Sequence, residues 1–192
     1  MIVSQERIRS FIAVDLDEPT LRERITNSQR GLEQTGAQLK LVNPNIMHLT
    51  LRFLGEIPRT AVEGVKEALS GLQFKAFEAH FSGLGVFPSM KRISVVWVGM
   101  TRGSEQLNEI FQQLEPKIRQ LGIPADSKGF SPHLTIARVR SGVNRDALAE
   151  YVSSMRDHEF GSMQVTSVRL KKSTLTPKGP IYETLQEARA VP

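Results

Sequence analysis

The sequence contains one short pattern twice, and this repetition limits the folds that are open to the chain. The stretch MHLTLRFLGE begins at residue 47, and PHLTIARVRS begins at residue 132. Both carry His-Leu-Thr followed by an aliphatic residue, and both have the composition of a β-strand. The histidines, at positions 48 and 133, are 85 residues apart, which is close to half of the 192-residue chain. We therefore expect two lobes of related build, each contributing one such strand.

Chance is a poor explanation of the repetition. The chain has only four histidines and eleven threonines among its 192 residues. Two histidines that both have threonine at the second following position are expected roughly 0.02 times in a random chain of this composition, before the aliphatic neighbours are required. Taken singly, either copy is explained equally well by a hydrogen-bonded strand histidine and a threonine chosen for its β-propensity.

Alternation along a strand determines which of these side chains point together. His48 and Thr50 project from one face of the first strand, and His133 and Thr135 project from one face of the second. The aliphatic residues between them project oppositely and suit the core of each lobe. If the two strands face a common cleft, two imidazoles and two hydroxyls line it.

The remaining pattern predicts alternating strands and helices. Helices are expected over residues 19–35, 60–72, 104–121 and 144–156, from their apolar spacing and their start and stop residues. Strands are expected over 10–16, on both sides of the Asn-Pro-Asn turn in 39–58, and over 74–88, 92–100, 129–140, 163–175 and 180–188. This order predicts an α+β protein with mainly antiparallel sheets. With no linker or low-complexity tract, we expect residues 1–192 to form a single bilobal domain.

Composition excludes several functions. There is no cysteine, so disulfides, thiolate nucleophiles and Cys-ligated zinc are all ruled out. No apolar run approaches membrane-spanning length, and the N-terminus does not resemble a secretory leader, so we expect a soluble, cytoplasmic protein. Lys and Arg number 25 against 20 for Asp and Glu, a net charge of +5, which slightly favours an anionic partner. Composition alone supports an ordinary solvated basic surface at least as well.

Two histidines with two hydroxyl donors suit an in-line displacement at phosphorus. One imidazole takes a proton from the attacking oxygen, and the other, on the opposite side, protonates the leaving oxygen; an ordinary pKa near 6.5 allows both tasks. The hydroxyls of Thr50 and Thr135 can donate to the non-bridging phosphate oxygens. Arg138 can add a charge-assisted contact, although a surface arginine at a strand end is an equally ordinary interpretation.

Other chemistries fit the motifs less well. No carboxylate lies within either motif, so metal ligation by His48 and His133 is disfavoured, and no metal or other cofactor is expected. The chain has no GxSxG, GxxxxGK[ST] or GxGxxG sequence, which argues against a serine triad, ATP or dinucleotides. Of the other two histidines, we interpret His80 as structural and His158 as a solvated loop residue.

The residues resemble a known family, the two-histidine phosphoesterases, and within it the RNA 2′,3′-cyclic phosphodiesterases, also called 2′-5′ RNA ligases. The resemblance covers nearly the whole chain. It is carried by SFIAVDL, MHLTLRFLGE, GLGVFP before RISVVWVGM, PHLTIARV and LKKSTLTPKGPIYETL, and the last of these is similar to archaeal members. It implies a bilobal α+β fold with a pseudo-two-fold axis, a central cleft lined by both motif strands, and helices on the outer faces.

The resemblance also implies roles for individual residues. It carries the catalytic pair onto His48 and His133, with Thr50 and Thr135 contacting phosphate and Arg138 adding a further phosphate contact. Phe53 would stack on a nucleobase, and its alternative is an ordinary core phenylalanine. Tyr182 and Lys178 match positions near the cleft rim without an assigned role.

The activity implied is metal-independent hydrolysis of RNA or nucleotide 2′,3′-cyclic phosphate ends to 2′-phosphomonoesters by a monomeric enzyme. Two alternatives stay open from the sequence. One is 2′-5′ joining of tRNA halves, in which a ribose hydroxyl replaces water. The other is a non-catalytic protein that binds RNA ends in the same cleft. The paired motifs argue against this alternative, because binding alone does not require a proton donor and a proton acceptor on opposite sides.

Overall fold

The structure is a computed structural model, and it describes residues 6–126 and 130–192. The helices are α1 (Pro19–Gln34), α2 (Arg59–Ser70), α3 (Ser104–Gln120) and α4 (Arg145–Ser154), with a 3₁₀ turn η1 (Pro44–Ile46). The strands are β1 (Arg7–Asp15), β2 (Leu39–Leu41), β3 (His48–Pro58), β4 (Phe77–Ser89), β5 (Arg92–Arg102), β6 (Leu134–Val139), β7 (Glu159–Val165), β8 (Ser167–Thr176) and β9 (Gly179–Arg189).

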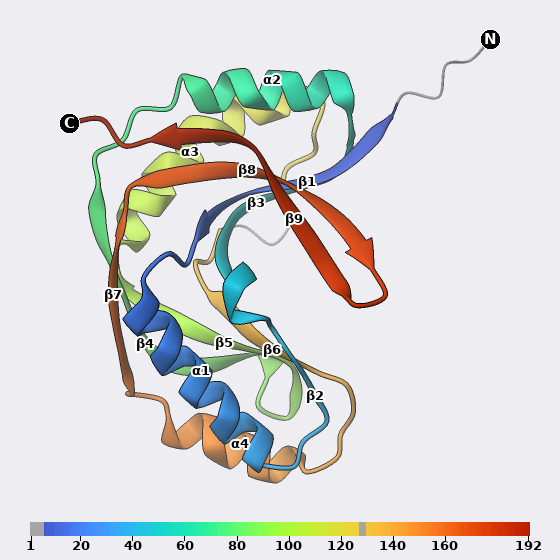
Figure 1. The fold of residues 1–192 in the computed structure, drawn as a ribbon, viewed down its shortest axis with the longest axis vertical. Coiled ribbons are helices and arrows are strands. Elements are labelled where there is room, and N and C mark those ends of the chain that lie inside the picture. The colour runs from blue at the N-terminus through green and yellow to red at the C-terminus, as the bar shows by residue number, and fades with distance from the viewer. Residues whose placement is uncertain (1–5, 127–129) are drawn as a thin grey trace.

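The strands form one curled sheet (Figure 1). Its order is β7-β4-β5-β6-β3-β1-β8-β9, and the short β2 pairs with β6 beside this path. All ladders between these strands are antiparallel within the described residues. The predicted α+β class with mainly antiparallel pairing is confirmed.

Two lobes meet in the middle of this sheet. We call the strands β3, β1, β8 and β9 with helices α2 and α3 the β1 lobe, and the strands β7, β4, β5, β6 and β2 with helices α1 and α4 the β5 lobe. Figure 1 shows the two helices of each lobe on its outer side, at the top and the bottom of the view. The predicted bilobal arrangement, with one motif strand in each lobe, is therefore confirmed.

The lobes are not the two halves of the sequence, because the chain crosses between them repeatedly. After β1 the chain enters the β5 lobe to form α1, and after β5 it enters the β1 lobe to form α3 (Figure 1). Strands β3 and β6 are each followed by a helix of their own lobe, α2 and α4 respectively. The same crossing in both directions gives the fold its pseudo-two-fold symmetry and ties the lobes together.

Local sequence explains the first of these crossings. Helix α1 begins with Pro19, and the carboxylate of Glu18 accepts a hydrogen bond from the Thr20 amide at 3.1 Å, which caps the free amides of the first turn. The helix ends before Gly36, whose φ of +72° is readily adopted only by glycine. The predicted helix over 19–35 is thus confirmed.

One strand prediction is wrong, and another extends too far. The segment 163–175 is not one strand: β7 pairs with β4 in the β5 lobe and β8 pairs with β1 in the other, so the chain changes lobes at Thr166. The Thr166 carbonyl accepts from the Ala190 amide at 2.8 Å instead of continuing a ladder. The strand expected over 129–140 is observed as Leu134–Val139, and Gly129 lies outside the described residues.

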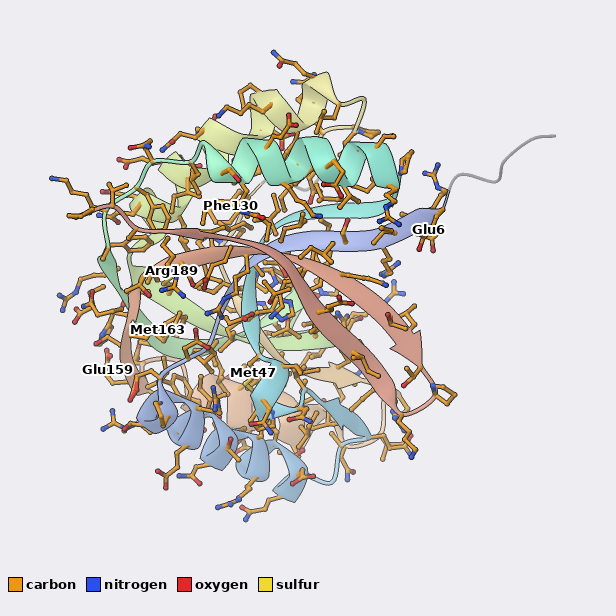
Figure 2. The ribbon with its side chains drawn as sticks, turned by 45° about the horizontal axis from the view of Figure 1, so that its top comes forward. Glu6, Met47, Phe130, Glu159, Met163 and Arg189 are labelled. Atoms are coloured by element: carbon orange, nitrogen blue, oxygen red, sulfur yellow. The ribbon has the colours of Figure 1, made fainter. Side chains whose placement is uncertain are left out.

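Buried contacts hold the segments that carry the motifs. Met47, labelled in Figure 2, is 2% exposed, and its carbonyl accepts from the Leu16 amide at 3.0 Å. The buried side chain of Gln29 in α1 donates to the carbonyls of Val42 and Ile136 at 2.8 and 2.9 Å. Because Val42 precedes the first motif and Ile136 follows the second, one amide group fixes the spacing of both segments.

Removing the side chain of Leu134 is expected to destabilise the whole fold. Leu134 is fully buried where β6 meets β3, so Leu134→Ala should lower the free energy of unfolding by about 3 kcal/mol through lost burial and an unfilled cavity. Chemical denaturation measures this loss. The control Leu175→Ala, at a leucine that is 67% exposed, should change stability by less than about 0.5 kcal/mol. Equal effects of the two variants would contradict this account of the core.

Candidate active site

The two HLT motifs are neighbours at the junction of the lobes. Leu49 of β3 pairs directly with Leu134 of β6, and both leucines are buried. The residues on either side of this pair therefore point to the opposite face of the sheet. In an antiparallel register through this pair, the position of His48 corresponds to that of Thr135, and the position of Thr50 corresponds to that of His133, the residue just before β6. This register directs the four motif residues to the face of the sheet opposite the two leucines.

The two imidazoles are held in the same way. Nδ1 of His48 is 2.8 Å from the carbonyl oxygen of Ile46, and Nδ1 of His133 is 2.7 Å from that of Ser131. A carbonyl can only accept, so Nδ1 carries the proton in each ring. When either ring is neutral, its unprotonated nitrogen is therefore Nε2, and this is the atom that can exchange a proton with a ligand.

Aromatic rings form walls beside each histidine. The ring of His48 lies 4.8 Å from Phe11 and 5.2 Å from Tyr182, measured between centroids. The ring of His133 lies 4.9 Å from Phe87 and 6.2 Å from Trp97. These walls limit the rotation of the imidazoles and exclude water from their flanks. His48 and His133 are both half-buried, so a ligand can reach them.

A charged cluster lies next to His48. Asp15, the last residue of β1, pairs directly with His48 in the ladder with β3. The Lys171 ammonium donates to both carboxylate oxygens of Asp15, at 2.8 and 2.6 Å, and Arg169 Nη1 donates to one of them at 2.7 Å. Burial alone would raise the pKa of Asp15, but the hydrogen bonds and charges of Lys171 and Arg169 outweigh it and hold that pKa below its ordinary value.

The surroundings of His48 favour its neutral form. Burial lowers the pKa of His48, and the positive charge of Lys171 acts in the same direction. The bond to the Ile46 carbonyl and the charge of Asp15 act in the opposite direction without cancelling this effect. With its pKa below the ordinary value of about 6.5, His48 is mainly neutral at pH 7.

Arg138 and Phe53, the other two residues singled out from the sequence, lie on the same face. Arg138 is exposed on β6, and its charge acts on Tyr182, whose ring touches that of His48. Phe53 pairs with Phe11 in the β1–β3 ladder, with the two rings 6.1 Å apart. Its side chain is 55% exposed, so the alternative of an ordinary core phenylalanine is wrong.

Sequence reasoning missed the charged cluster and most of the aromatic walls. Asp15 stands at the end of the apolar run SFIAVDL, where a carboxylate is unexpected in a buried strand, and this was the available signal. Lys171 and Trp97 carry no comparable signal, because their roles depend on which strands are neighbours. The remaining histidines lie elsewhere: Nε2 of His80 is 2.5 Å from the Glu159 carboxylate, and His158 is exposed against the ring of Phe160.

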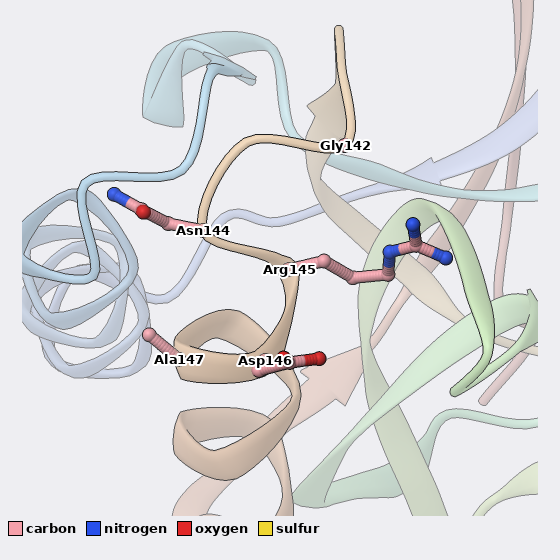
Figure 3. Close-up of a pocket in the computed structure, with 5 residues that line it drawn as sticks. All are labelled: Gly142, Asn144, Arg145, Asp146 and Ala147. Carbon is pink, nitrogen blue, oxygen red and sulfur yellow. The ribbon is translucent and has the colours of Figure 1, made fainter.

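A hollow on the protein surface lies away from the four motif residues. It has a volume of about 370 Å³ and lies at the start of α4, where Arg145 reaches the β4–β5 turn and donates to the Lys91 carbonyl (Figure 3). None of the motif residues lines it. Over residues 6–126 and 130–192, no group of three or more His, Asp or Glu side chains is arranged to hold a metal ion. None of the helices in these ranges has the length and hydrophobicity of a membrane-spanning segment.

Comparison with models of known protein families identifies the family of this chain. The family model described as LigT like Phosphoesterase matches residues 14–97 and, separately, residues 98–182. The first match contains His48 and the second contains His133. The chain belongs to the LigT-like phosphoesterase family. The resemblance found in the sequence is confirmed, and the two matches agree with the pseudo-two-fold arrangement of the lobes.

Individual relatives match over nearly the full length. A protein of Methanothermobacter thermautotrophicus, named RNA 2′,3′-cyclic phosphodiesterase, is 37% identical over 187 residues, which are 95% of this chain and 99% of the relative. A protein of Aeropyrum pernix with the same name is 37% identical over 167 residues, 87% and 95% of the two chains. A crystal structure of a Thermus thermophilus protein superposes with a TM-score of 0.79 at 28% identity, covering 95% and 97%.

The cluster around Asp15 gives the protein a pH-dependent stability. Asp15→Asn leaves Lys171 and Arg169 without their shared carboxylate and should lower the free energy of unfolding at pH 7 by on the order of 2 kcal/mol. Because the pKa of Asp15 is lowered by folding, its stabilisation is present above the unfolded value of about 3.9 and is lost as the pH falls through the folded value. Denaturation of wild type and variant between pH 3 and pH 8 measures the difference.

The difference in stability between wild type and Asp15→Asn should be fully present between pH 7 and pH 8 and should shrink below pH 4. The exposed Asp157, which forms no ion pair within the described ranges, supplies the control Asp157→Asn. The control should follow the wild type at every pH. A difference between wild type and Asp15→Asn that persists unchanged at pH 3 would show that Asp15 is not stabilised as a carboxylate.

Proposed function

We propose that the protein hydrolyses RNA or nucleotide 2′,3′-cyclic phosphate ends to 2′-phosphomonoesters, with His48 and His133 as general acid and base. The single observation that carries the proposal is the register at the junction of the lobes, where Leu49 pairs with Leu134. It directs both imidazoles to one face. The shared name of the full-length relatives, RNA 2′,3′-cyclic phosphodiesterase, supports this substrate class.

The geometry of the histidines fits an in-line displacement. Water attacks phosphorus while one Nε2 takes its proton, and the other Nε2 protonates the leaving 3′ oxygen. A P–O bond to water forms, the P–O3′ bond breaks, and the phosphate stays on the 2′ oxygen. In both rings the Nδ1 proton is directed to a backbone carbonyl, which holds the ring and stabilises the imidazolium that each becomes in turn.

The remaining motif residues serve the transferring phosphate and the base. The hydroxyls of Thr50 and Thr135 donate to the non-bridging oxygens, where negative charge is largest in the transition state. Arg138, on the same face of the sheet, adds a charge-assisted contact to the phosphate. The exposed ring of Phe53, backed by Phe11, offers a face on which a nucleobase stacks. The proton donor, the proton acceptor and the groups that bind the phosphate all belong to the protein, so this scheme has no step that calls for a metal ion.

We also propose the wider setting of this activity. The ends of RNA fragments, tRNA fragments among them, are the substrates, and the protein acts in the cytoplasm as a monomer. The continuous sheet supports the proposal that residues 1–192 act as one bilobal domain. The reaction that joins RNA ends uses the same groups with a ribose hydroxyl in place of water, so it is tested as a competing outcome.

Product analysis in the presence of EDTA tests the proposal. Wild-type protein should convert adenosine 2′,3′-cyclic phosphate to adenosine 2′-phosphate, and His48→Ala and His133→Ala should each lower turnover by about 10² to 10⁴-fold, because each removes one proton transfer. The exposed His158 supplies the control His158→Ala, which should keep wild-type turnover. Circular dichroism establishes that all three variants are folded.

Other products would contradict the proposal. Binding without turnover would indicate a non-catalytic RNA-end protein, and inhibition by EDTA would indicate a metal phosphohydrolase. With an RNA that ends in a 2′,3′-cyclic phosphate and a second RNA with a 5′ hydroxyl, a ligated product in excess over the 2′-phosphate would identify joining as the main reaction. Full activity of both histidine variants would exclude the assigned roles.

A further inference from the structure

Two cations stand directly opposite each other beside the histidines. Lys40 of β2 pairs with Arg138 of β6 in an antiparallel ladder. Like charges in this relation repel and destabilise a sheet. Both side chains are exposed, and neither forms an ion pair with any residue that the structure describes. The pair therefore has a repulsion that an added anion would relieve.

The pair lies on the face that carries the motifs. Leu39 and Leu41 pack against the core, so Lys40 between them points to the opposite face, with Arg138. Arg138 pairs with Val95 of β5, and Val95 pairs with Phe87, whose ring contacts that of His133. A chain of direct neighbours thus links the two cations to the second histidine.

A second observation places Arg138 near the first histidine. Burial raises the pKa of Tyr182, and the charges of Arg138 and Arg9 act in the opposite direction. Tyr182 belongs to the β1 lobe, and its ring is 5.2 Å from that of His48. The field of Arg138 therefore reaches across the junction between the lobes, on the side where the imidazoles lie.

Lys40 and Arg138 lie at different distances from Thr135, which binds the reacting phosphate in the proposed function. Thr135 pairs with Trp97 and Arg138 pairs with Val95, with a bulge in the β5–β6 ladder between these pairs. Two strand steps, about 7 Å, therefore separate Thr135 from Arg138. Lys40 lies on the neighbouring strand, about 5 Å beyond Arg138. The long side chain of Arg138 spans much of the first distance. Lys40 is the outer of the two cations, because it lies one strand beyond Arg138.

We propose that Lys40 forms a second phosphate site beside Arg138: Arg138 contacts the cyclic phosphate between His48 and His133, and Lys40 holds the next phosphodiester of the RNA strand. The inference rests on the proposed function, because it takes the position of the end from it. A mononucleotide with a cyclic phosphate leaves this site empty. An RNA strand fills it and removes the repulsion between the cations, so the protein prefers RNA ends to free nucleotides.

Binding of two products measures the second site. Isothermal titration calorimetry compares adenosine 2′-phosphate with the dinucleotide ApA that ends in a 2′-phosphate. Lys40→Gln should weaken binding of the dinucleotide about fivefold more than binding of the mononucleotide, the size expected for losing one partly solvated charge-assisted contact. It should also lower the salt dependence of dinucleotide binding by about 0.7 in the log–log slope.

Two further variants control for charge and location. Lys40→Arg keeps the charge and should keep the dinucleotide preference. Lys117→Gln removes an exposed lysine of α3 whose ammonium lies near Gly71, on the outer side of the β1 lobe, and it should leave both affinities unchanged. An equal effect of Lys40→Gln on both ligands, or no effect on either, would overturn the proposal.

The same phosphate chemistry has a second source, the 5′-phosphate of a nucleotide. A third ligand, adenosine with both 5′- and 2′-phosphates, separates the sources. Sensitivity to Lys40→Gln in the dinucleotide supports an RNA strand, whereas sensitivity confined to the 5′-phosphorylated mononucleotide would overturn it. Turnover of the cyclic mononucleotide by wild-type protein tests the proposed function separately, so failure of one proposal is distinguishable from failure of the other.

Discussion

The pairing of Leu49 with Leu134 is the contact on which the rest of the site depends. As far as the described residues extend, the ladder between β3 and β6 consists of this one pair, and it is the place where the sheets of the two lobes become continuous. A slip of one residue on either strand would turn one histidine and one threonine into the core. The buried leucines on one face and the polar motif residues on the other therefore specify the same register, and the packing that stabilises the fold also sets the geometry of the site.

The crossing of the chain keeps this junction rigid. Each lobe is covered by two helices, one that follows a strand of the same lobe and one that follows a strand of the other lobe (Figure 1). Helix α1 follows β1 but packs on the β5 lobe, and helix α3 follows β5 but packs on the β1 lobe. The lobes therefore cannot separate without unpacking a helix. The buried amide of Gln29, which bonds to the carbonyls of Val42 and Ile136, adds a polar contact at the same place. A site shared between lobes in this way keeps two proton-exchanging nitrogens at a fixed separation, which general acid and base catalysis needs.

Much of this arrangement follows from the sequence, because period-two alternation around each HLT motif states which side chains point together. Helix boundaries at Pro19 and Gly36 also follow from local chemistry. What the sequence does not contain is the identity of neighbouring strands. The change of lobe at Thr166, the facing of Asp15 and His48, and the opposition of Lys40 and Arg138 all depend on pairings between distant segments. Phe53 shows the same limit, since its apolar side chain suits both a core and an exposed platform, and only its cross-strand partner Phe11 distinguishes them.

The central claim is that the two imidazoles face one phosphorus-sized gap. Titration of the protein with adenosine 2′-phosphate, followed by the NMR signals of the imidazole rings, tests it without relying on turnover. The account predicts that the His48 and His133 signals move together, with one shared dissociation constant and one ligand per chain, while His80 and His158 stay still. Movement of only one of the two rings, or separate dissociation constants for them, would contradict it.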